Sequence, residues 1–562
     1  MYSDKKIVNM LTSFLIAKGI RKVVVCPGSR NIPIVNNLFE SEDIQCFPVT
    51  DERSAGFYAL GLSLCAKEQV AVCVTSGSAL LNVSPAIAEA YYRHLPVILI
   101  SADRPEEWID RLEGQTMRQY DTLRNIVKAQ TDLSEIKEDD TQKENYFSLC
   151  LNKCLNKAVE PDPGPVHINV HLNEPLFNFN IHCLPEITNI KSIRSCTDIG
   201  VEAKEIITKF ISADRKLILI GQLPHEDRQL GRIIKELSKY FVVLSEPLSS
   251  ASFVPFDKAL PGVEALLNDK RIDFLLTLGG TFVSKQIKQY IRSCDINEHW
   301  EINPVGEIHD VSMQQTGIIS CSEKVFLERL FEETKAYYSG EQDIKSGFDI
   351  VWNDAISRVQ QAIDDYVPAY SQLSVVRDFE LSLEDMEYDY DVHYANSMSV
   401  RLGCIYSQHY IWCNRGMNGI EGSVSTAAGF SLATEKIVFC VVGDLSFFYD
   451  QNALWNNNLR GNLRILLLNN GGGGIFSRLK GLDATIGSSD YIFGVHETCA
   501  RGICEQNDIG YIAVRSNEEY RKALVHFLTE VTSRPMVLEV FTSTDDDNKA
   551  LDELNKIIKN SK

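Results

Sequence analysis

Residues 437–476 read IVFCVVGDLSFFYDQNALWNNNLRGNLRILLLNNGGGGIF and contain two short apolar runs, 437–442 and 464–468. Each run has the length and aliphatic character of a buried strand. Polar residues follow both runs closely, with Asp444 after the first and Asn470 after the second. Because the carboxyl ends of neighbouring parallel strands meet at one edge of a sheet, we expect these two side chains to lie close together.

These polar residues suit a divalent cation. The Asp444 carboxylate, the side-chain oxygen of Asn470 and a backbone carbonyl of the glycine loop, at Gly472, could fill part of an oxygen octahedron around Mg²⁺. The four glycines would let the backbone close around a diphosphate without Cβ clashes. A Gly-Asp turn or an Asn-Asn-Gly-Gly turn alone is commonly structural. The two halves together, 26 residues apart and each after a strand, favour the cation site.

Short apolar runs alternate with amphipathic stretches throughout the 562 residues, which predicts β-α-β units and parallel sheets. Further runs of this kind lie at 22–26, 45–49, 70–74, 97–101, 216–221, 242–244, 274–278 and 536–541. We expect an α/β fold of three domains, each with a mostly parallel sheet flanked by helices. Their predicted bounds are 1–180, 190–345 and 370–562, and the charged stretch 341–345 ends the second domain.

Composition narrows the class of protein. Hydrophobic residues make up 44% and charged residues 23%, as in globular chains, and the net charge of −20 opposes binding to nucleic acid or to anionic membranes. We find neither a secretion signal nor an uninterrupted apolar stretch of about 18 residues, so we expect a cytoplasmic protein. The 15 cysteines include no C-x-x-C pair, which favours free thiols over disulfides or a zinc site.

The Gly443-Asp444 and Asn469-Asn470 pair resembles the cofactor motif of enzymes that depend on thiamine diphosphate (ThDP), in which GD and NN bracket a helix and a strand. The resemblance implies the ThDP-binding fold, with the diphosphate held by this C-terminal domain through Mg²⁺, or Mn²⁺ in its place. The residues that it assigns to cofactor binding here are Gly443, Asp444, Leu445, Ser446, Asn470 and Gly472.

An acidic residue in the first third fits the same cofactor. Glu52 follows the run 45–49 in TDERSAGFYALGLS, where an acid at a helix start is usually only a cap. The turn TSGSA at 75–79 resembles the small-residue turn beside the catalytic glutamate of ThDP enzymes. This resemblance implies that Glu52 promotes the imino tautomer of the aminopyrimidine. It also implies that Glu52 reaches the cofactor of another subunit, in a homo-oligomer that is a dimer or a tetramer.

Ten stretches resemble one subfamily, the 2-succinyl-5-enolpyruvyl-6-hydroxy-3-cyclohexene-1-carboxylate synthases of menaquinone biosynthesis. They are CPGSRNIPI (26–34), DERSAGFYALGL (51–62), TSGSALLNVSPAIAEA (75–90), SADRPEEWID (101–110), GQTMRQ (114–119), SKQ (284–286), ANSMSVR (395–401), NRGMNGIEGSVSTAAG (414–429), GDLSFFYDQNAL (443–454) and NNGGGGIF (469–476). The subfamily implies a transferase that decarboxylates 2-oxoglutarate with ThDP. The resulting succinyl semialdehyde carbanion then adds 1,4 to isochorismate.

The implied substrates are rich in carboxylates, which need fixed cationic partners in a chain of net charge −20. A single basic residue is by default a surface charge, so only the motif context assigns these roles. The cations that the resemblance places around the substrates are Arg30, Arg104, Lys285, Arg401 and Arg415. Ser29, Gln115 and Ser397 would add hydrogen bonds. The residues assigned to catalysis are Glu52, Arg30, Gln115, Ser397, Arg401 and Arg415.

Three apolar residues complete the implied site. Ile420, five residues after Arg415, resembles the bulky residue that bends ThDP so that its amino group meets the reacting carbon. Ile475 and Phe476 would form an apolar wall beside the substrate, and they equally fit an ordinary core. Phe476 and Ser397 would also contact the cofactor.

Two other functions stay open at this point. Another ThDP-dependent 2-oxo acid decarboxylase or acetolactate-type synthase shares the cofactor motif, although the arginine cluster argues against small neutral acceptors. A catalytically silent ThDP-fold regulatory subunit would have no need to keep Glu52, Asp444 and Asn470. The stretch NRGMNGIEG departs from the subfamily's usual NRGASGIDG, and Gln286 stands where some members have arginine, which concerns substrate contacts more than the reaction class.

Overall fold

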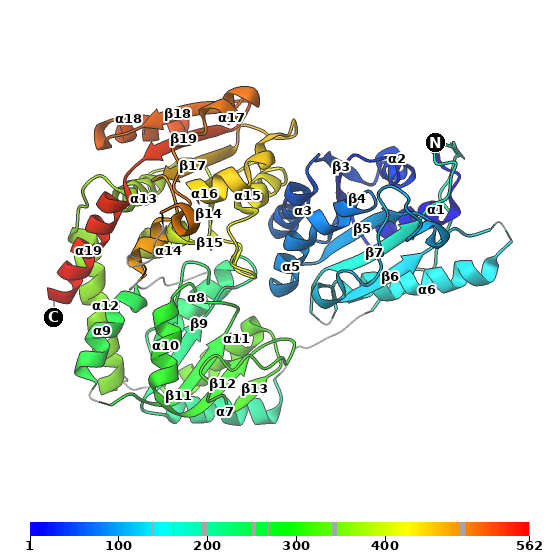
Figure 1. Cartoon of the computed structure of the whole chain (residues 1–562). Helices are drawn as coiled ribbons and strands as arrows, with labels where there is room; N and C mark the ends of the chain where they lie inside the picture. The colour runs from blue at the N-terminus through cyan, green and yellow to red at the C-terminus, as the bar shows by residue number, and fades with distance from the viewer. Residues whose placement is uncertain are drawn as a thin grey trace.

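The computed structural model describes residues 1–560 except 138, 161, 193–198, 250–254, 268, 340–345, 480, 481 and 483–488. Three parallel β-sheets, each flanked by helices, follow one another along the chain (Figure 1). This arrangement confirms the predicted α/β fold. The charged stretch 341–345 lies outside the described residues, and among those that are described no helix is long and apolar enough to span a bilayer.

The N-terminal sheet has the strand order β3-β2-β4-β5-β7-β6, and every neighbouring pair is parallel. Its strands are β2 (Lys22–Val25), β3 (Gln45–Pro48), β4 (Val70–Val74), β5 (Val97–Asp103), β6 (Ala129–Leu133) and β7 (Val166–His171). The helices around it are α1 (Lys6–Ala17), α2 (Ile32–Glu40), α3 (Glu52–Ala66), α4 (Ser78–Asn82), α5 (Ser84–Tyr92), η1 (Glu106–Trp108), η2 (Arg124–Ile126) and α6 (Thr141–Lys157). An antiparallel pair joins β1 (Tyr2–Ser3) to β8 (Phe179–Ile181).

The middle sheet has the order β10-β9-β11-β12-β13 and is also parallel. Its strands are β9 (Lys216–Ile220), β10 (Val242–Ser245), β11 (Arg271–Leu278), β12 (Asp295–Ile302) and β13 (Gly317–Ile319). Its helices are α7 (Val201–Ser212), α8 (Arg228–Leu237), α9 (Phe256–Leu266), α10 (Lys285–Ser293) and α11 (Glu323–Tyr337). The following helices, α12 (Gly347–Asp365) and α13 (Gln372–Leu383), lead to the third sheet.

The C-terminal sheet has the order β15-β14-β16-β17-β19-β18, again with parallel neighbours. Its strands are β14 (Tyr390–Tyr394), β15 (Ile411–Trp412), β16 (Ile437–Gly443), β17 (Leu463–Asn469), β18 (Gly510–Val514) and β19 (Met536–Phe541). Its helices are α14 (Met398–Tyr406), α15 (Ser423–Ser431), α16 (Asp444–Tyr449), η3 (Gln451–Leu454), η4 (Gly474–Arg478), η6 (Ser489–Phe493), α17 (Arg501–Gln506), α18 (Asn517–Thr529) and α19 (Thr544–Asn560).

The cores of the three sheets are joined by apolar contacts. One buried cluster runs from the middle sheet through the fully buried Trp352 of α12 to the helices of the C-terminal sheet. A second cluster joins helices α3 and α5 of the N-terminal sheet to α15 and the strands β16 and β17. The C-terminal sheet is therefore packed against both of its neighbours.

Helix α3 crosses α15 at two glycines. A Cβ atom at Gly61 of α3 would overlap the backbone of Thr426 on α15, and a Cβ at Gly429 of α15 would overlap the backbone of Tyr58. The Tyr58 hydroxyl donates a hydrogen bond to the carbonyl oxygen of Ala453, 2.7 Å away. Glycine at these two positions is thus what lets the N-terminal and C-terminal parts pack at backbone-to-backbone distance.

We expect Gly61→Ala to lower the free energy of unfolding by about 1–3 kcal/mol, because the added methyl group must push α3 away from α15. Thermal or denaturant unfolding measures the change. Gly502→Ala is the matched control, since Gly502 is helical and a Cβ there meets no atom within 4 Å. An unchanged stability in Gly61→Ala would contradict the close crossing.

Candidate active site

Asp444 and Asn470 meet at the carboxyl edge of the C-terminal sheet, as the sequence predicts. Strands β16 and β17 are parallel neighbours, with Gly443 opposite Leu468. Asp444 is 3% exposed, and its Oδ2 accepts hydrogen bonds from the backbone N–H groups of Asn470 at 3.2 Å, and of Gly471 and Gly472 at 2.9 Å each. One carboxylate oxygen therefore ties the glycine loop after β17 to the end of β16.

Among the described residues, the other oxygen of Asp444, Oδ1, accepts only from the N–H of Leu445, at 2.6 Å. Burial raises the pKa of Asp444, and the hydrogen bonds from Leu445 and Gly472 act in the opposite direction. A buried carboxylate of this kind gains stability from a nearby positive charge. The Oδ1 atom keeps acceptor capacity for a cation.

The side chain of Asn470 is oriented by a second acid. Its Nδ2 donates to Oδ2 of Asp547 on α19 at 2.9 Å, and its amide oxygen accepts no hydrogen bond from the residues that the structure describes. Asp547 also accepts from the N–H of Gln372 at 2.8 Å and from the hydroxyl of Thr542 at 3.1 Å. Burial raises the pKa of Asp547 to about 6 despite these hydrogen bonds.

The glycine loop cannot accept side chains without moving. Gly471 has φ of 78° and Gly472 has φ of 152°, and a Cβ at Gly472 would lie 3.0 Å from the carbonyl oxygen of Phe493. The carbonyl oxygen of Gly472 accepts one hydrogen bond, from the N–H of Gly474 at 2.9 Å, and has a second lone pair. The carboxylate of Asp444, the amide of Asn470 and the carbonyl of Gly472 thus gather at one edge of the sheet, which we name the cation edge. Such oxygen donors fit Mg²⁺, through which a diphosphate can be held.

The loop that carries Ile420 lies between this edge and helix α3. The hydroxyl of Ser446 donates to the carbonyl oxygen of Ile420, and a Cβ at Gly422 would overlap the ring of Phe57 on α3. Ile420 is 39% exposed, so its side chain is available for contact with a ligand. The loop therefore connects the cation edge to the helix that begins at Glu52.

Glu52 is the first residue of α3, and its surroundings come from two parts of the chain. The side chain of Asp51 caps α3 through the N–H of Arg53 and accepts from Nδ2 of Asn452 at 2.7 Å. Asn452 belongs to η3, shortly after Asp444 in sequence. The Nδ2 of Asn82 donates to Oε2 of Glu52 at 3.2 Å. The start of α3 is thus held against the C-terminal part of the same chain. That Glu52 reaches the cofactor of another subunit stays a prediction.

The apolar residues expected beside the substrate lie in the segment after the glycine loop. Ile475 and Phe476 belong to η4, and both are half-buried. The ring of Phe476 stacks on Phe493 with centroids 6.3 Å apart. The side chain of Leu445 lies 3.7 Å from the position that a Cβ would take at Gly494. These residues form one apolar side of the cation edge.

Arg415 and Arg401 form a cationic pair between the C-terminal and middle sheets. Arg415 is 8% exposed and donates from Nη1 to Oδ1 of Asn396 at 3.0 Å and from Nη2 to the carbonyl oxygen of Phe282 at 3.2 Å. Arg401 donates to the carbonyl oxygen of Ser397 at 2.6 Å, and Ser397 has φ of 72°. Burial and then the charge of Arg415 lower the pKa of Arg401. The two arginines therefore share one electrostatic environment.

Lys285 is the first residue of α10 and is exposed. Burial and then the charge of Arg415 lower the pKa of Lys288 on the same helix, and Arg292 and Lys285 act in the same direction. The loop before α10 is fixed by Glu246, which accepts from the N–H groups of Val283 and Ser284 at 2.7 Å each. Helix α10 therefore brings Lys288 into the electrostatic environment of Arg415.

A second group of site residues lies at the carboxyl edge of the N-terminal sheet. Arg30, which follows β2, donates to the carbonyl oxygen of Leu172 and to Oε1 of Glu174, both at 3.0 Å. Burial and the charge of Arg104 lower the pKa of Arg30. Arg104 follows β5 and donates to the carbonyl oxygen of Gly114 at 3.1 Å. Ser29 precedes Arg30, and Gln115 follows Gly114, whose carbonyl accepts the hydrogen bond of Arg104; both Ser29 and Gln115 are exposed.

The structure thus places the predicted residues in two groups. Arg30, Arg104, Ser29 and Gln115 lie with the N-terminal sheet, and Lys285, Ser397, Arg401 and Arg415 lie with the other two. In the part of the chain that the structure describes, no hydrogen bond or ion pair crosses from one group to the other. The roles assigned to these residues stay predictions.

Sequence reasoning missed three buried acids that hold the site loops: Glu89, Glu246 and Asp547. Each is under 9% exposed. A signal for Glu89 exists, because it is a lone acid in the otherwise apolar helix stretch SPAIAEAYY. Asp547 lies 77 residues from its partner Asn470, and no spacing rule points to that contact.

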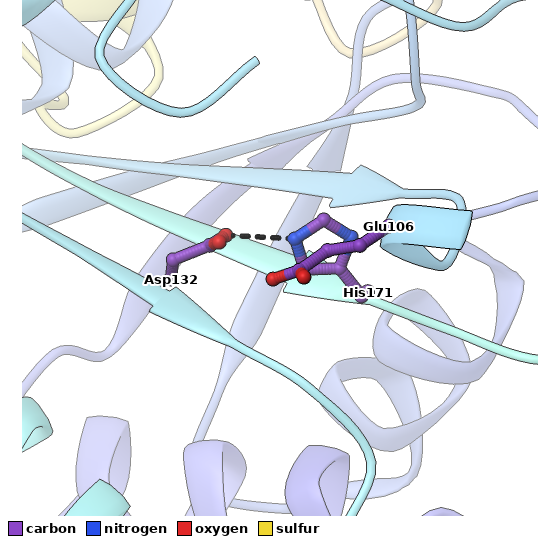
Figure 2. A group of neighbouring side chains, drawn as sticks. All are labelled: Glu106, Asp132 and His171. Carbon is purple, nitrogen blue, oxygen red and sulfur yellow. Dashed lines mark hydrogen bonds and ion pairs between the residues drawn. The ribbon is translucent and has the colours of Figure 1, made fainter. Parts of the chain in front are cut away.

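A cluster of Glu106, Asp132 and His171 has the atom spacing of a metal site (Figure 2). Nε2 of His171 is 2.9 Å from Oδ1 of Asp132, and Nδ1 contacts the carbonyl oxygen of Arg104. Because a carbonyl oxygen only accepts, Nδ1 carries a proton, while Nε2 faces the carboxylate of Asp132. These two contacts raise the pKa of His171 to about 9 despite its burial, so we interpret the cluster as an ion pair that supports the backbone of Arg104.

Comparisons with known proteins agree with this geometry. Residues 5–126 match the family model described as "Thiamine pyrophosphate enzyme, N-terminal TPP binding domain", and residues 198–375 match "Middle domain of thiamine pyrophosphate". Thiamine pyrophosphate is another name for ThDP. The two matches include the regions of Glu52 and of Lys285.

Several similar proteins are 2-succinyl-5-enolpyruvyl-6-hydroxy-3-cyclohexene-1-carboxylate synthases. The synthase of Phocaeicola vulgatus is 38% identical over 100% of both chains. The synthase of Bacteroides thetaiotaomicron is 38% identical over 98% of both chains. The synthase of Christiangramia forsetii is 34% identical over 96% of both chains.

We expect the imidazolium of His171 to make stability depend on pH. Burial alone would lower the pKa of His171, but the bonds to Asp132 and to the carbonyl of Arg104 raise it to about 9. The raised pKa means that the stabilisation is complete below pH 6.5 and is lost as pH rises through 9. His171→Asn should therefore cost roughly 3 kcal/mol at pH 6 and much less at pH 9.5, in denaturant unfolding followed against pH. A cost independent of pH would show that the imidazole is neutral.

Proposed function

The chain belongs to the family of 2-succinyl-5-enolpyruvyl-6-hydroxy-3-cyclohexene-1-carboxylate synthases, and we propose that it makes the compound for which the family is named from 2-oxoglutarate and isochorismate. In this reaction 2-oxoglutarate loses carbon dioxide, and the remaining four-carbon unit adds 1,4 to isochorismate, as a step of menaquinone biosynthesis. The observation that carries the proposal is the 38% identity that runs through the full length of the chain.

ThDP is the cofactor of the family, and it supplies an electron sink when it is bound. We assign the divalent cation, Mg²⁺ or Mn²⁺, to Asp444, Asn470 and the carbonyl of Gly472. This assignment is supported by the orientation of Asn470, whose Nδ2 is held by Asp547, by the acceptor capacity left on Asp444, and by a loop that excludes Cβ atoms. Gly443, Leu445 and Ser446 would border the diphosphate from the β16 side.

Glu52 is the residue that we assign to proton movement on the aminopyrimidine ring. Its carboxyl group would donate a proton at the ring nitrogen and hold the cofactor in its reactive tautomer. The assignment is supported by its position on α3, whose start contacts η3 and whose next turn packs on Gly422. Ile420 would support the bent shape of the cofactor.

The cations would bind the carboxylates of the two substrates. Arg401 and Arg415 share one positive region, to which we assign Lys285 as well, and Arg30 with Arg104 forms another. Hydrogen bonds from Ser29, Gln115 and Ser397, and an apolar wall of Ile475 and Phe476, complete the proposed pocket. Two separate positive regions suit two anionic substrates in a chain of net charge −20.

We also propose a homo-oligomer, a dimer or a tetramer, with active sites between subunits. Glu52 and the cation edge come from different sheets, so one interface between them completes the site, within a chain or between chains. The proposed domain bounds are 1–180, 190–345 and 370–562, and each large sheet falls within one of them.

We expect the purified protein to consume isochorismate only when ThDP, Mg²⁺ and 2-oxoglutarate are all present. The loss of isochorismate absorbance, with each component left out in turn, measures this. Release of carbon dioxide from a different 2-oxo acid would instead identify another ThDP-dependent decarboxylase. No reaction with any 2-oxo acid would favour a catalytically silent subunit.

We expect Glu52→Gln to lower turnover at least about 100-fold, because a carboxamide cannot deliver the proton. Binding of ThDP with Mg²⁺, measured by isothermal titration calorimetry, should stay within a few-fold of the wild type. Full activity of this variant would remove Glu52 from the proton relay.

The same variant tests the arrangement of subunits when it is mixed with Asp444→Asn. If Glu52 serves a neighbouring subunit, hybrid oligomers contain one intact site, and activity returns on mixing. If Glu52 serves its own chain, each site keeps one defect and the mixture stays inactive.

A further inference from the structure

Residues 413–417, which we name the arginine loop, connect β15 toward α15 and carry Arg415. The middle sheet holds this loop at two points. Nε2 of Gln222 donates to the carbonyl oxygen of Cys413 at 2.9 Å, and the hydroxyl of Thr281 donates to the carbonyl oxygen of Arg415 at 3.0 Å. Hydrogen bonds from the middle part of the chain thus hold a loop that belongs to the C-terminal sheet.

Helix α5 of the N-terminal part, together with the residue that follows it, forms hydrogen bonds with both ends of the arginine loop. The two carboxylate oxygens of Glu89 accept from the N–H of Gly416 at 2.9 Å and from the N–H of Met417 at 2.6 Å. Arg93, the residue that follows α5, donates from Nη1 to the carbonyl oxygen of Cys413 at 2.6 Å. Both ends of the arginine loop, on either side of Arg415, are therefore hydrogen-bonded to the same part of the N-terminal region.

The Glu89 carboxylate is held in an environment that is costly for a charge. It is 2% exposed, and burial raises its pKa. Two backbone N–H groups and the nearby charge of Arg93 offset part of this cost. A Cβ at Gly416 would lie 2.9 Å from Oε2 of Glu89, so the glycine is what lets the carboxylate approach the loop.

Helix α5 is also packed closely on α3, which begins at Glu52. A Cβ at Gly56 of α3 would lie 2.6 Å from the Cβ of Ala86 on α5. The helices are in close contact at this point and cannot approach further without a backbone shift. Helix α5 therefore sets the position of the arginine loop relative to Glu52.

Arg415 keeps a donor for a ligand. Its Nη atoms bond to Asn396 and Phe282, while its buried Nε has no hydrogen-bond partner among the residues that the structure describes. A buried donor without a partner is costly, and a substrate carboxylate would satisfy it.

We propose that Glu89 is a positioning residue that holds the arginine loop so that Arg415 can bind a substrate carboxylate at a fixed place. The inference rests on the proposed function. It also accounts for Met417, where the subfamily usually has a smaller residue. Met417 contributes its backbone N–H to Glu89 and its side chain is 49% exposed, so the side chain at this position is free to vary.

The test compares Glu89→Gln and Glu89→Asp with Arg415→Lys in steady-state kinetics. Glutamine places an NH₂ group against one of two N–H donors, and aspartate is one methylene too short to reach both. Arg415→Lys first identifies which substrate, 2-oxoglutarate or isochorismate, has its KM raised. We expect Glu89→Gln to raise the KM of that same substrate about tenfold, with kcat changed less than about threefold. In the Arg415→Lys background, Glu89→Gln should raise the KM of that substrate little further.

Two further readouts separate positioning from general destabilisation. Hydrogen exchange followed by mass spectrometry should show faster exchange at Gly416 and Met417 in Glu89→Gln. Tyr58→Phe is the matched control, because it removes another buried hydrogen bond between the same two parts of the chain without touching the arginine loop. It should lower the melting temperature and leave both KM values unchanged.

The outcomes are distinct. A wild-type protein that consumes neither substrate would contradict the proposed function itself. An active wild type with unchanged KM in both Glu89 variants would overturn the role of Glu89 alone. A rise in the KM of the other substrate, or equal rises in Tyr58→Phe, would also overturn it.

Discussion

The crossing of α3 over α15 at Gly61 and Gly429 is the contact on which the candidate site depends. The backbones touch there, so the N-terminal sheet cannot come closer to the C-terminal sheet, and a side chain at either glycine would push the two apart. The start of α3 then reaches η3 through Asp51 and Asn452, and α5 reaches the arginine loop through Glu89. Neither contact involves the cation edge directly, yet both place N-terminal groups around it.

The electrostatics of the site run against the net charge of the chain, which is −20. The arginines of the site are anchored mostly by main-chain carbonyl oxygens. Arg401 bonds to that of Ser397, Arg415 to that of Phe282, and Arg30 to that of Leu172. A carbonyl fixes the direction of a guanidinium without neutralising its charge. Arg401 and Arg415 are therefore held in place while their positive charge stays available for anionic ligands, whereas Arg30 also forms an ion pair with Glu174.

The apolar runs of the sequence predicted the central strands, because burial on both faces leaves an uninterrupted aliphatic pattern. Strand β7, VHINVH, was missed because polar residues alternate in it. These side chains are buried and bond to one another: Asn169 donates to Asp103 and Asp132, and His167 contacts Ser101. The motifs placed Asp444 and Asn470 correctly at one sheet edge. Glu89 and Asp547 escaped prediction because their partners are far away in sequence and only the fold brings them together.

Three buried acids share one role in this fold. Glu246, Glu89 and Asp547 each accept hydrogen bonds from a loop of the candidate site. Burial raises the pKa of Glu246 to about 7 and that of Asp547 to about 6, so ionisation of these groups opposes folding as pH rises through those values. They are therefore poor sources of stability near neutral pH. What a carboxylate offers, and an amide does not, is two acceptor oxygens for two donors. Glu246 and Glu89 each accept from two successive backbone N–H groups, one at each carboxylate oxygen. This need for two acceptors explains why an acid occupies these positions, although a neutral amide would cost less to bury.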